Sequence, residues 1–460
     1  VLEWLLRHAA RTGDARALTM VEGTCEAMAR GGMYDQLGGG FARYSVDADW
    51  VVPHFEKMLY DNALLLRAYL HWWKLTESPL ALRVVHETAD FMLRELRTPE
   101  GGFASALDAD TDGEEGRYYA WTPAQLCEEL GDDDGAWAAA LLSVTEAGTF
   151  EHGSSTLQRR VDPEDVQRWE SVRGRLLTAR QARTYPHRDD KVVAAWNGLA
   201  IAGLADAGAL LDQPRWVEAA EAAADLLVAV HLDEGARLAR TSRDGRVGAS
   251  SGVLEDYACV AEGMQALYAA TGEPAWLEMA GRLLDAVLEH FRDGEGGFFD
   301  TPDDGEQLIR RPRQAQDNAT PAGALTAAGA LLTQSAYTGS ASLRAAAEAA
   351  LATVTPLAQR APRAVGMGLA VAEALVDGPL EVAIVGEPGS QRDALAQVAR
   401  RSARPGLVVA VGGPDDEGEV PLLAGRPLRG GVATAYVCRD FACRAPVTAP
   451  EDLHSQVSHR

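Results

Sequence analysis

The segment GGMYDQLGGGFARYSVDADWVVPHFEKMLYDNALLL, residues 31–66, sets the pattern for the rest of the chain. It joins two amphipathic helical stretches and contains two glycine clusters, several aromatic residues and a run of charged residues. Loops of this length inside compact domains are uncommon and are usually functional or disordered. Its aromatic and apolar content argues against disorder, because such a segment can pack. We therefore interpret it as one wall of a binding site.

A unit of two helices repeats along the chain around this segment. A turn such as Thr271-Gly272 leads into a helix whose apolar residues recur at steps of three and four, as at Ala280, Leu283 and Val287. The predicted helix pairs are 2–30, 54–97, 122–183, 193–231, 253–292 and 318–357. Six such hairpins predict a mainly α fold, a closed six-hairpin (α/α)6 barrel. An open α-solenoid uses the same hairpins and is the alternative.

The connections between the pairs share a Gly-Gly-Phe sequence, at 39–41, 101–103 and 296–298. Glycine permits the turn, and the aromatic residue anchors a short strand. Because all these connections run from an outer helix to the next inner helix, we expect them to gather at one mouth of the barrel. The chemistry of the protein is expected at that mouth.

The pattern changes after residue 375. The runs EVAIVG (381–386), LVVAVG (407–412) and TAYVC (434–438) are typical of short strands, and 390–402 is typical of a helix. We predict a barrel over 1–375 and a small α/β subdomain over 376–460. The run EVAIVGEPGS lacks both the phosphate-loop and the dinucleotide-binding patterns, so a structural role is expected for it.

Charge and composition exclude several classes of protein. The 460 residues carry a formal charge of −24, which disfavours binding to nucleic acid or to an anionic membrane. No apolar run approaches the ~20 residues needed to cross a bilayer. The chain does not begin with Met, so we expect it to start partway into a longer protein. The five scattered cysteines fit a reducing cytoplasm, and the close pair Cys438 and Cys443 lacks the partners of a metal site.

Four residues are candidates for acid–base chemistry. His54 titrates near neutral pH, and a shielded Glu56 is tunable upward, so these two form a plausible acid–base pair. Glu255 and Asp256 supply adjacent carboxylates that face Glu56 if the helices line one funnel, and glycoside cleavage uses two carboxylates. The alternative for His54 is a hydrogen bond to the loop backbone.

Other polar and aromatic residues at the starts of inner helices and on their loops are predicted to hold a ligand. Carboxylates and amides suit hydroxyl groups, and aromatic rings stack on the apolar faces of sugars. An Asp or Asn at a helix start is also a common cap, which is the alternative for each one alone. The predicted ligand-binding residues are Tyr34, Asp35, Lys57, Asp61, Asn62, Asp108, Asp110, Asp190, Lys191, Trp196, Asn197, Tyr257, Asp317 and Asn318.

Two acidic stretches have alternatives to ligand binding. Residues 108–113, DADTDG, begin like a calcium loop, but Tyr119 stands where the bidentate glutamate belongs. We expect an acidic loop folding over the mouth rather than a metal site. Residues 188–191, RDDK, offer either a salt-bridged rim or a ligand contact.

Several of these stretches together resemble the thioredoxin-domain-containing family that includes spermatogenesis-associated protein 20. They are residues 31–65, GGFASALDADTDGEEGRYYAWTPAQL, DDKVVAAWNGLAIAGLADAG, LEDYA, DNATPAG and TAYVCRDFACRAPV. The resemblance implies a thioredoxin-like domain followed by an α/α barrel similar to those of N-acylglucosamine 2-epimerases and six-hairpin glycosidases. This chain contains no thioredoxin part and no Cys-x-x-Cys, so the resemblance carries no redox activity over to these residues.

Two functions fit these observations. The first is a carbohydrate-active enzyme, an epimerase, isomerase or hydrolase that needs no cofactor. The second is a non-catalytic binding or scaffold module that works with the thioredoxin-like domain. Turnover of a sugar discriminates between them.

Overall fold

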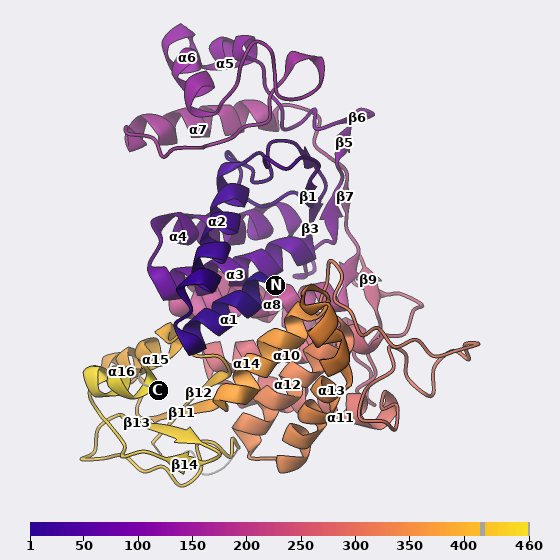
Figure 1. Ribbon diagram of the computed structural model, residues 1–460, viewed down its shortest axis with the longest axis vertical. Coiled ribbons are helices and arrows are strands. Elements are labelled where there is room, and N and C mark those ends of the chain that lie inside the picture. The colour runs from indigo at the N-terminus through magenta and orange to yellow at the C-terminus, as the bar shows by residue number, and fades with distance from the viewer. Residues whose placement is uncertain (415–418, 459–460) are drawn as a thin grey trace.

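The computed structural model describes residues 1–414 and 419–458, and its barrel is built on a ring of inner helices. Within these residues the ring has six members, each packed on the next, and α14 packs on both α12 and α1 to close it (Figure 1). The inner helices are α1 (Leu2–Thr12), α3 (Leu59–Thr76), α8 (Ala194–Leu210), α10 (Leu254–Thr271), α12 (Gly323–Thr338) and α14 (Gly366–Asp377). The predicted closed barrel is therefore confirmed, and the open solenoid is not.

Outer helices cover the ring, each joined to an inner helix by a short turn. They are α2 (Ala15–Arg30), α4 (Pro79–Phe91), α9 (Pro214–Leu226), α11 (Pro274–His290) and α13 (Ala341–Arg360), and π-helical turns at Met92–Leu96 and Leu227–His231 extend α4 and α9. The turns explain the sequence repeat. α10 ends at Gly272, where φ is +76°, and Pro274 opens the next helix.

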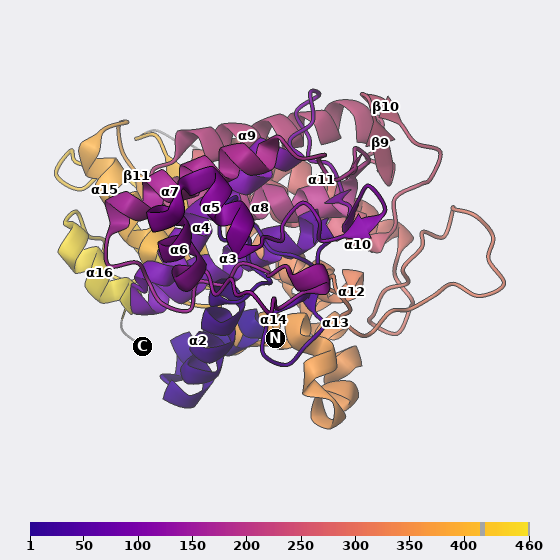
Figure 2. The ribbon, with the colours of Figure 1, turned by 90° about the horizontal axis from the view of Figure 1, so that it is seen from above.

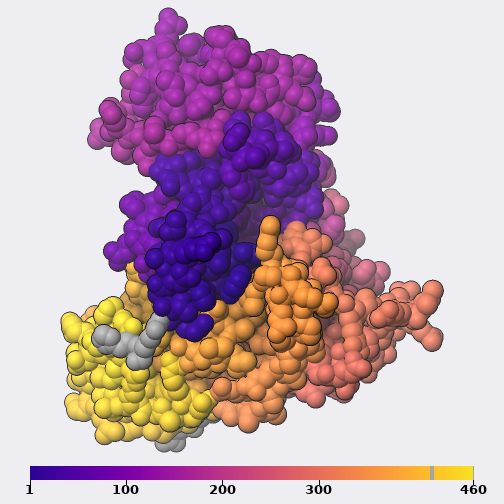
Figure 3. All heavy atoms as spheres, viewed as in Figure 1, coloured from indigo at the N-terminus to yellow at the C-terminus, as the bar shows by residue number. Residues whose placement is uncertain are grey.

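The third predicted hairpin, 122–183, is wrong as a member of the ring. Its residues form α5 (Pro123–Leu130), α6 (Asp132–Leu141) and α7 (Val166–Gln181), which bury Trp121, Leu126 and Trp169 in a core of their own. This lobe lies at the opposite end of the molecule from the C-terminal sheet (Figures 1 and 3). Helical periodicity shows that a face is buried but not which partner buries it, and α14 takes the sixth place in the ring.

The C-terminal region is a four-stranded sheet with order β12-β11-β13-β14, in which β11 and β12 are parallel. Its elements are β11 (Leu380–Val385), α15 (Ser390–Arg401), β12 (Leu407–Gly412), β13 (Thr434–Arg439), β14 (Ala442–Cys443) and α16 (Pro450–Ser458). One face packs on Tyr268 and Tyr337 of the barrel, and the other is covered by α15 and α16. β11 is therefore buried throughout, as its continuous apolar run predicts. The predicted boundary at residue 375 stays a prediction.

Helix α15 attaches this region to the ring by binding the carbonyl ends of three inner helices. Gln397 donates to the carbonyl of Ala209 on α8, and Arg400 donates to those of Ala269 and Ala270 on α10. Arg401 donates to the carbonyl of Lys74 on α3. The last carbonyls of a helix have no intrahelical donor. These side chains therefore supply hydrogen-bond donors to the carbonyls at this end of the ring.

The five cysteines comprise one disulfide-bonded pair and three free thiols. Cys438 and Cys443 form a disulfide between β13 and β14, a pairing that the expectation of a reducing environment does not include. Cys25, Cys127 and Cys259 are free.

A cytoplasmic location stays a prediction. Among the described residues, the helices are too short or too polar to cross a membrane.

The loops at the N-terminal ends of the inner helices form small sheets, as the Gly-Gly-Phe pattern indicates. Phe41, Phe103, Leu238 and Phe298 each bridge to a residue six or seven positions earlier, which closes the loop. The hairpin 241–247 in one of these loops is labelled β9 and β10 in Figure 2. The short strands are β1 (Tyr44–Ser45), β2 (Pro53–His54), β3 (Lys57–Met58), β4 (Ala106–Leu107), β5 (Asp110–Thr111), β6 (Glu114–Glu115), β7 (Arg188–Asp189), β8 (Val192–Val193), β9 (Thr241–Arg243) and β10 (Arg246–Val247).

Side chains at the fourth position of three inner helices clamp three of these bridges. Asn62 accepts a hydrogen bond from the Phe41 amide at 2.7 Å and donates to the Phe41 carbonyl at 3.1 Å. Asn197 does the same to Phe103, at 2.8 and 3.1 Å. On α10 the equivalent residue is Tyr257, whose hydroxyl accepts from the Leu238 amide at 2.9 Å. These three side chains are buried and committed to loop backbone, and their predicted ligand contacts stay predictions.

Replacing Asn197 by Ala is expected to lower the free energy of unfolding by about 3 kcal/mol, because the buried Phe103 amide and carbonyl lose their partner. The matched control is Asn318→Ala, an exposed Asn whose loss should cost no more than about 0.5 kcal/mol. Urea unfolding followed by circular dichroism measures both. Equal costs for the two variants would contradict the clamp.

Candidate functional site

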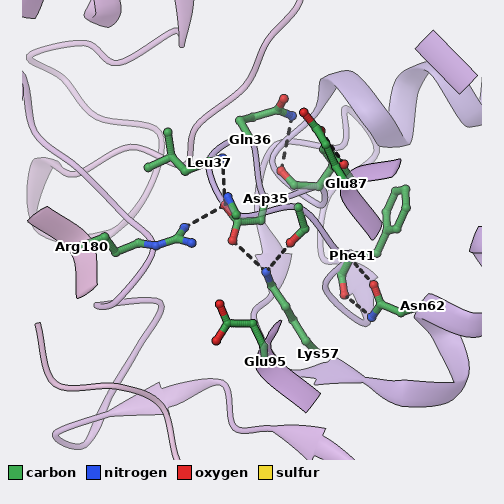
Figure 4. Close-up of polar contacts among 12 residues, drawn as sticks. Asp35, Gln36, Leu37, Phe41, Lys57, Asn62, Glu87, Glu95 and Arg180 are labelled. Atoms are coloured by element: carbon green, nitrogen blue, oxygen red, sulfur yellow. Dashed lines mark hydrogen bonds and ion pairs between the residues drawn. The ribbon is translucent and has the colours of Figure 1, made fainter. Parts of the chain in front are cut away.

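A buried cluster of three charged residues holds the loop 31–58 in place. Asp35 lies 2.8 Å from Lys57 Nζ and 2.8 Å from Arg180 Nη1, and all three side chains are at most 5% exposed (Figure 4). The backbone amides of Leu37 and Gly38 also donate to Asp35 Oδ1, each at 3.0 Å. The cluster joins the loop, the strand β3 and the lobe helix α7.

Electrostatics show how tightly these charges depend on one another. Burial alone would raise the pKa of Asp35, but Arg180 and Lys57 hold that pKa well below its usual range. Burial lowers the pKa of Lys57 to about 8, although Asp35 opposes the shift. The Lys57 ammonium also lies 4.6 Å from the Phe91 ring and 4.8 Å from the Tyr119 ring.

These contacts give Tyr34, Asp35 and Lys57 a structural role. The Tyr34 hydroxyl donates to Glu87 on α4 at 2.7 Å, which anchors the start of the same loop. The cavity beside this cluster measures only about 20 Å³, the size of roughly one water molecule. The predicted ligand contacts of Tyr34, Asp35 and Lys57 stay predictions.

Replacing Asp35 by Asn should lower the free energy of unfolding by about 3–5 kcal/mol, because Lys57 and Arg180 stay buried without a carboxylate. The control is Glu348→Gln, which removes an exposed pair with Arg344 and should cost at most about 0.5 kcal/mol. Chemical denaturation measures both. A cost for Asp35→Asn no larger than for the control would show that the cluster does not hold the loop.

A cavity of about 410 Å³ opens at the loop end of the ring. Tyr60 at the start of α3 and Trp196 at the start of α8 form one wall, with their rings edge to face and 4.8 Å apart. The other walls come from the loops before α10 and α12. Among its lining residues are Tyr60, Trp196, Arg240, Glu255, Asp300 and Asn318.

The carboxylates on the α10 side are organised by Arg240. Its guanidinium lies 2.6 Å from Glu255 and 3.3 Å from Asp256. Asp256 is fully buried and also accepts hydrogen bonds from the amides of Ala195 and Val253, at 3.0 and 2.9 Å. Burial raises the pKa of Asp256 to about 7. Asp256 thus positions Arg240, and Glu255 is the carboxylate that lines the cavity.

A second acidic group lies on the α3 side. Glu56 pairs with Arg43 at 2.9 Å and lies 3.7 Å from His54 Nε2. His54 Nδ1 lies 2.7 Å from Glu115, and its ring stacks on Tyr44. The predicted pair His54 and Glu56 is therefore brought together, and His54 also contacts the β5–β6 hairpin.

Asp61 differs from these ion-paired carboxylates. Its Oδ2 atom is buried and has no hydrogen-bond partner among the described residues. Burial raises its pKa to about 7, Glu56 adds to the shift, and Arg43 opposes it. A carboxyl group that holds its proton near neutral pH is able to act as a general acid.

The remaining predicted residues lie on the rim or in turns. Asp108 and Asp110 are exposed, and the calcium-like stretch forms the β5–β6 hairpin. Asp190 pairs with Arg188 at 2.6 Å, and Lys191 pairs with Asp189 at 3.1 Å. Asp317 accepts from the amides of Ala322 and Met367, at 3.0 and 2.8 Å, which fixes the starts of α12 and α14. Asn318 is exposed at the cavity.

Sequence reasoning missed Arg43, Arg240 and Asp300, although a signal for them exists. Each stands two positions after a bridging residue, namely Phe41, Leu238 and Phe298. Burial raises the pKa of Asp300, and the charge of Glu255 adds to the shift. In the described part of the chain, His290, Asp303 and Asp304 form the group with metal-ligand spacing, and it lies outside this cavity.

Fold and site together define the class: an α/α barrel whose loop-built mouth carries aromatic residues and carboxylates. No protein-family model matches the chain. The chain is similar to spermatogenesis-associated protein 20 of Homo sapiens, at 33% identity, and of Mus musculus, at 31%, over 98% of its own length. An uncharacterized protein of Caenorhabditis elegans is 27% identical over the same share. The chain spans 64% of the length of the human and mouse proteins.

Two solved structures have a similar arrangement of helices. A cellobiose 2-epimerase from Bacillus thermoamylovorans matches at a TM-score of 0.41 and 10% identity, over 75% of this chain and 68% of its own. An unsaturated glucuronyl hydrolase specific for heparin matches at 0.45 and 13%, over 77% and 71%.

Replacing Asp61 by Asn tests the raised pKa. The folded-state pKa of about 7 exceeds the unfolded value of about 3.9, so ionisation of Asp61 destabilises the folded protein. The stability that Asp61 contributes is present below about pH 4 and is lost as the pH rises through about 7. The free energy of unfolding of the wild type should therefore fall relative to Asp61→Asn between these values. The exposed Asp285→Asn serves as control, and a flat difference for Asp61→Asn would contradict the raised pKa.

Proposed function

We propose that the mouth of the barrel binds a sugar-like, polyhydroxylated ligand and acts on it by acid–base chemistry. The observation that carries this proposal is the 410 Å³ cavity lined by the Tyr60–Trp196 pair and by Arg240, Glu255 and Asp300. Its volume lies within the range of small-molecule sites. Aromatic rings offer a stacking surface for sugar rings, and the charged groups offer hydrogen bonds to hydroxyls.

The acidic groups at the mouth have environments that suit different roles. Glu255 forms an ion pair with Arg240 at 2.6 Å, which fits a charge-stabilising group. Asp61 follows the wall residue Tyr60 but does not line the cavity, and its pKa of about 7 fits an acid placed behind that wall. Carboxyl groups whose environments separate their pKa values are the usual basis for such a division. His54 and Glu56 remain candidates for proton transfer on the α3 side, and Asp256 is a positioning residue.

A second candidate function is a binding module that works with a thioredoxin-like domain. The observation that favours it is that the human relative extends well beyond the matched region, since this chain spans 64% of it. In that case the mouth binds a ligand without converting it. That the further domain is thioredoxin-like is implied by the sequence resemblance and is part of the proposal.

A ligand-observed NMR screen of mono- and disaccharides, followed for hours, tests the proposal. Wild type is expected to bind a sugar and to generate new sugar resonances. Trp196→Ala should weaken binding by about tenfold, because it removes the stacking surface. Glu255→Gln and Asp61→Asn should retain binding and lose conversion. The exposed Asp285→Asn on α11 should behave like the wild type.

Each result of this screen has a definite meaning. Binding without conversion favours the module, and no binding of any sugar overturns the proposed ligand class. If His54→Ala and Glu56→Gln both leave turnover unchanged, proton transfer does not lie on that side of the mouth.

A further inference from the structure

A second cavity, of about 180 Å³, lies at the opposite end of the ring from the mouth. It is bounded by α1, by the C-terminal ends of α3, α8 and α10, and by residues 402–406, which precede β12. No residue lines both this cavity and the 410 Å³ cavity at the mouth. Small residues such as Ala205, Ala209 and Gly406 leave this space open.

Basic side chains dominate the charged lining of this second cavity. The basic residues are Arg7, Arg67, Lys74, Arg400 and Arg404, and the acidic ones are Glu3 and Asp206. Such an excess of positive charge inside a fold requires anionic partners, because unpaired buried charges are costly.

Three of these basic residues have carboxylates within ion-pair distance. Arg7 lies 2.6 Å from Glu3. Arg67 lies 3.0 Å from Asp206 and 2.6 Å from Glu262. Arg404 lies 3.5 Å from Asp377. The charges of these three residues are therefore matched within the protein.

Lys74 and Arg400 are different. Among the described residues, neither forms an ion pair with a carboxylate, and the Lys74 ammonium has no hydrogen bond. Arg400 donates only to the carbonyls of Ala269 and Ala270, and its Nε atom is buried without a partner. Burial lowers the pKa of Lys74 to about 8 and also lowers the pKa of Arg400. The charge of Asp206 opposes the shift at Lys74. Helix carbonyls offer only partial negative charge, so no contacting carboxylate neutralises Lys74 or Arg400.

We infer that this second cavity binds a phosphate group, with Lys74 and Arg400 supplying the charged donors. Phosphate is an anion that accepts several hydrogen bonds, which suits two cations that no carboxylate contacts, and charge-assisted hydrogen bonds to it are strong. Lys74 belongs to α3 of the ring and Arg400 to α15 of the C-terminal region. A bound phosphate group thus links the barrel to the helix that covers its end.

Calorimetric titration with inorganic phosphate, at constant ionic strength set by sodium chloride, tests this site. Lys74→Met should weaken phosphate binding by about tenfold or more. Lys191→Met, at an exposed lysine on the rim of the other end, should change the affinity by less than about twofold. Ala209→Leu fills the cavity without changing the charge and should also abolish binding. Equal affinity in wild type and in both cavity variants would overturn the proposal.

Stability measurements keep a loss of binding distinct from a loss of folding. Without phosphate, Lys74→Met should unfold at the same temperature as the wild type or higher, since it removes a desolvated charge. Phosphate should raise the unfolding temperature of the wild type but not of Lys74→Met.

Glycerol phosphate in place of inorganic phosphate identifies the source of the group. Binding of both ligands assigns the site to a phosphate monoester, and binding of inorganic phosphate alone assigns it to the free ion. Binding of neither overturns the proposal. All titrations use the full 460-residue chain.

Discussion

The requirement that a buried charge be paired governs the upper half of this structure. Asp35 neutralises only one of the two cations that contact it, so Lys57 and Arg180 both depend on a single carboxylate. Lys57 is the first residue of β3 and precedes α3 by two positions, and Arg180 ends the lobe helix α7. One carboxylate therefore fixes the loop, the entry into an inner helix and the lobe at the same time. The positions of Arg43, His54 and Glu56 at the mouth follow from that constraint.

The two ends of the ring are chemically opposite. The N-terminal ends of the inner helices carry partial positive charge and face the mouth, where Asp61, Glu255 and Asp256 occupy first turns. The C-terminal ends carry partial negative charge and meet Gln397, Arg400 and Arg401 of α15. Acidic groups are thus favoured at the mouth, and basic groups are favoured at the end of the ring that α15 covers. The polarity of the helices alone separates the two kinds of cavity.

Much of the fold could be predicted from the sequence, and the reasons for the failures are physical. Helical periodicity and the Gly-Gly-Phe loops predict the hairpins and the common mouth. They do not show that 122–183 leaves the ring and that α14 replaces it, because an amphipathic face does not name its partner. Asn62 and Asn197 were predicted to hold a ligand, yet each bonds a loop backbone. An Asn at a helix start is equally suited to binding a ligand and to bonding the loop backbone. The register of the loop against the helix determines which of these two contacts forms.

The clamp on each loop has a consequence for how such a protein diversifies. The side chain at the fourth position of an inner helix secures one bridging residue, and the residue two positions later in the loop is left to vary. Arg43 and Arg240 occupy that place in two clamped loops, one held by Asn62 and the other by Tyr257. Selection is therefore able to change what the mouth recognises one loop at a time, with the framework of the barrel left intact.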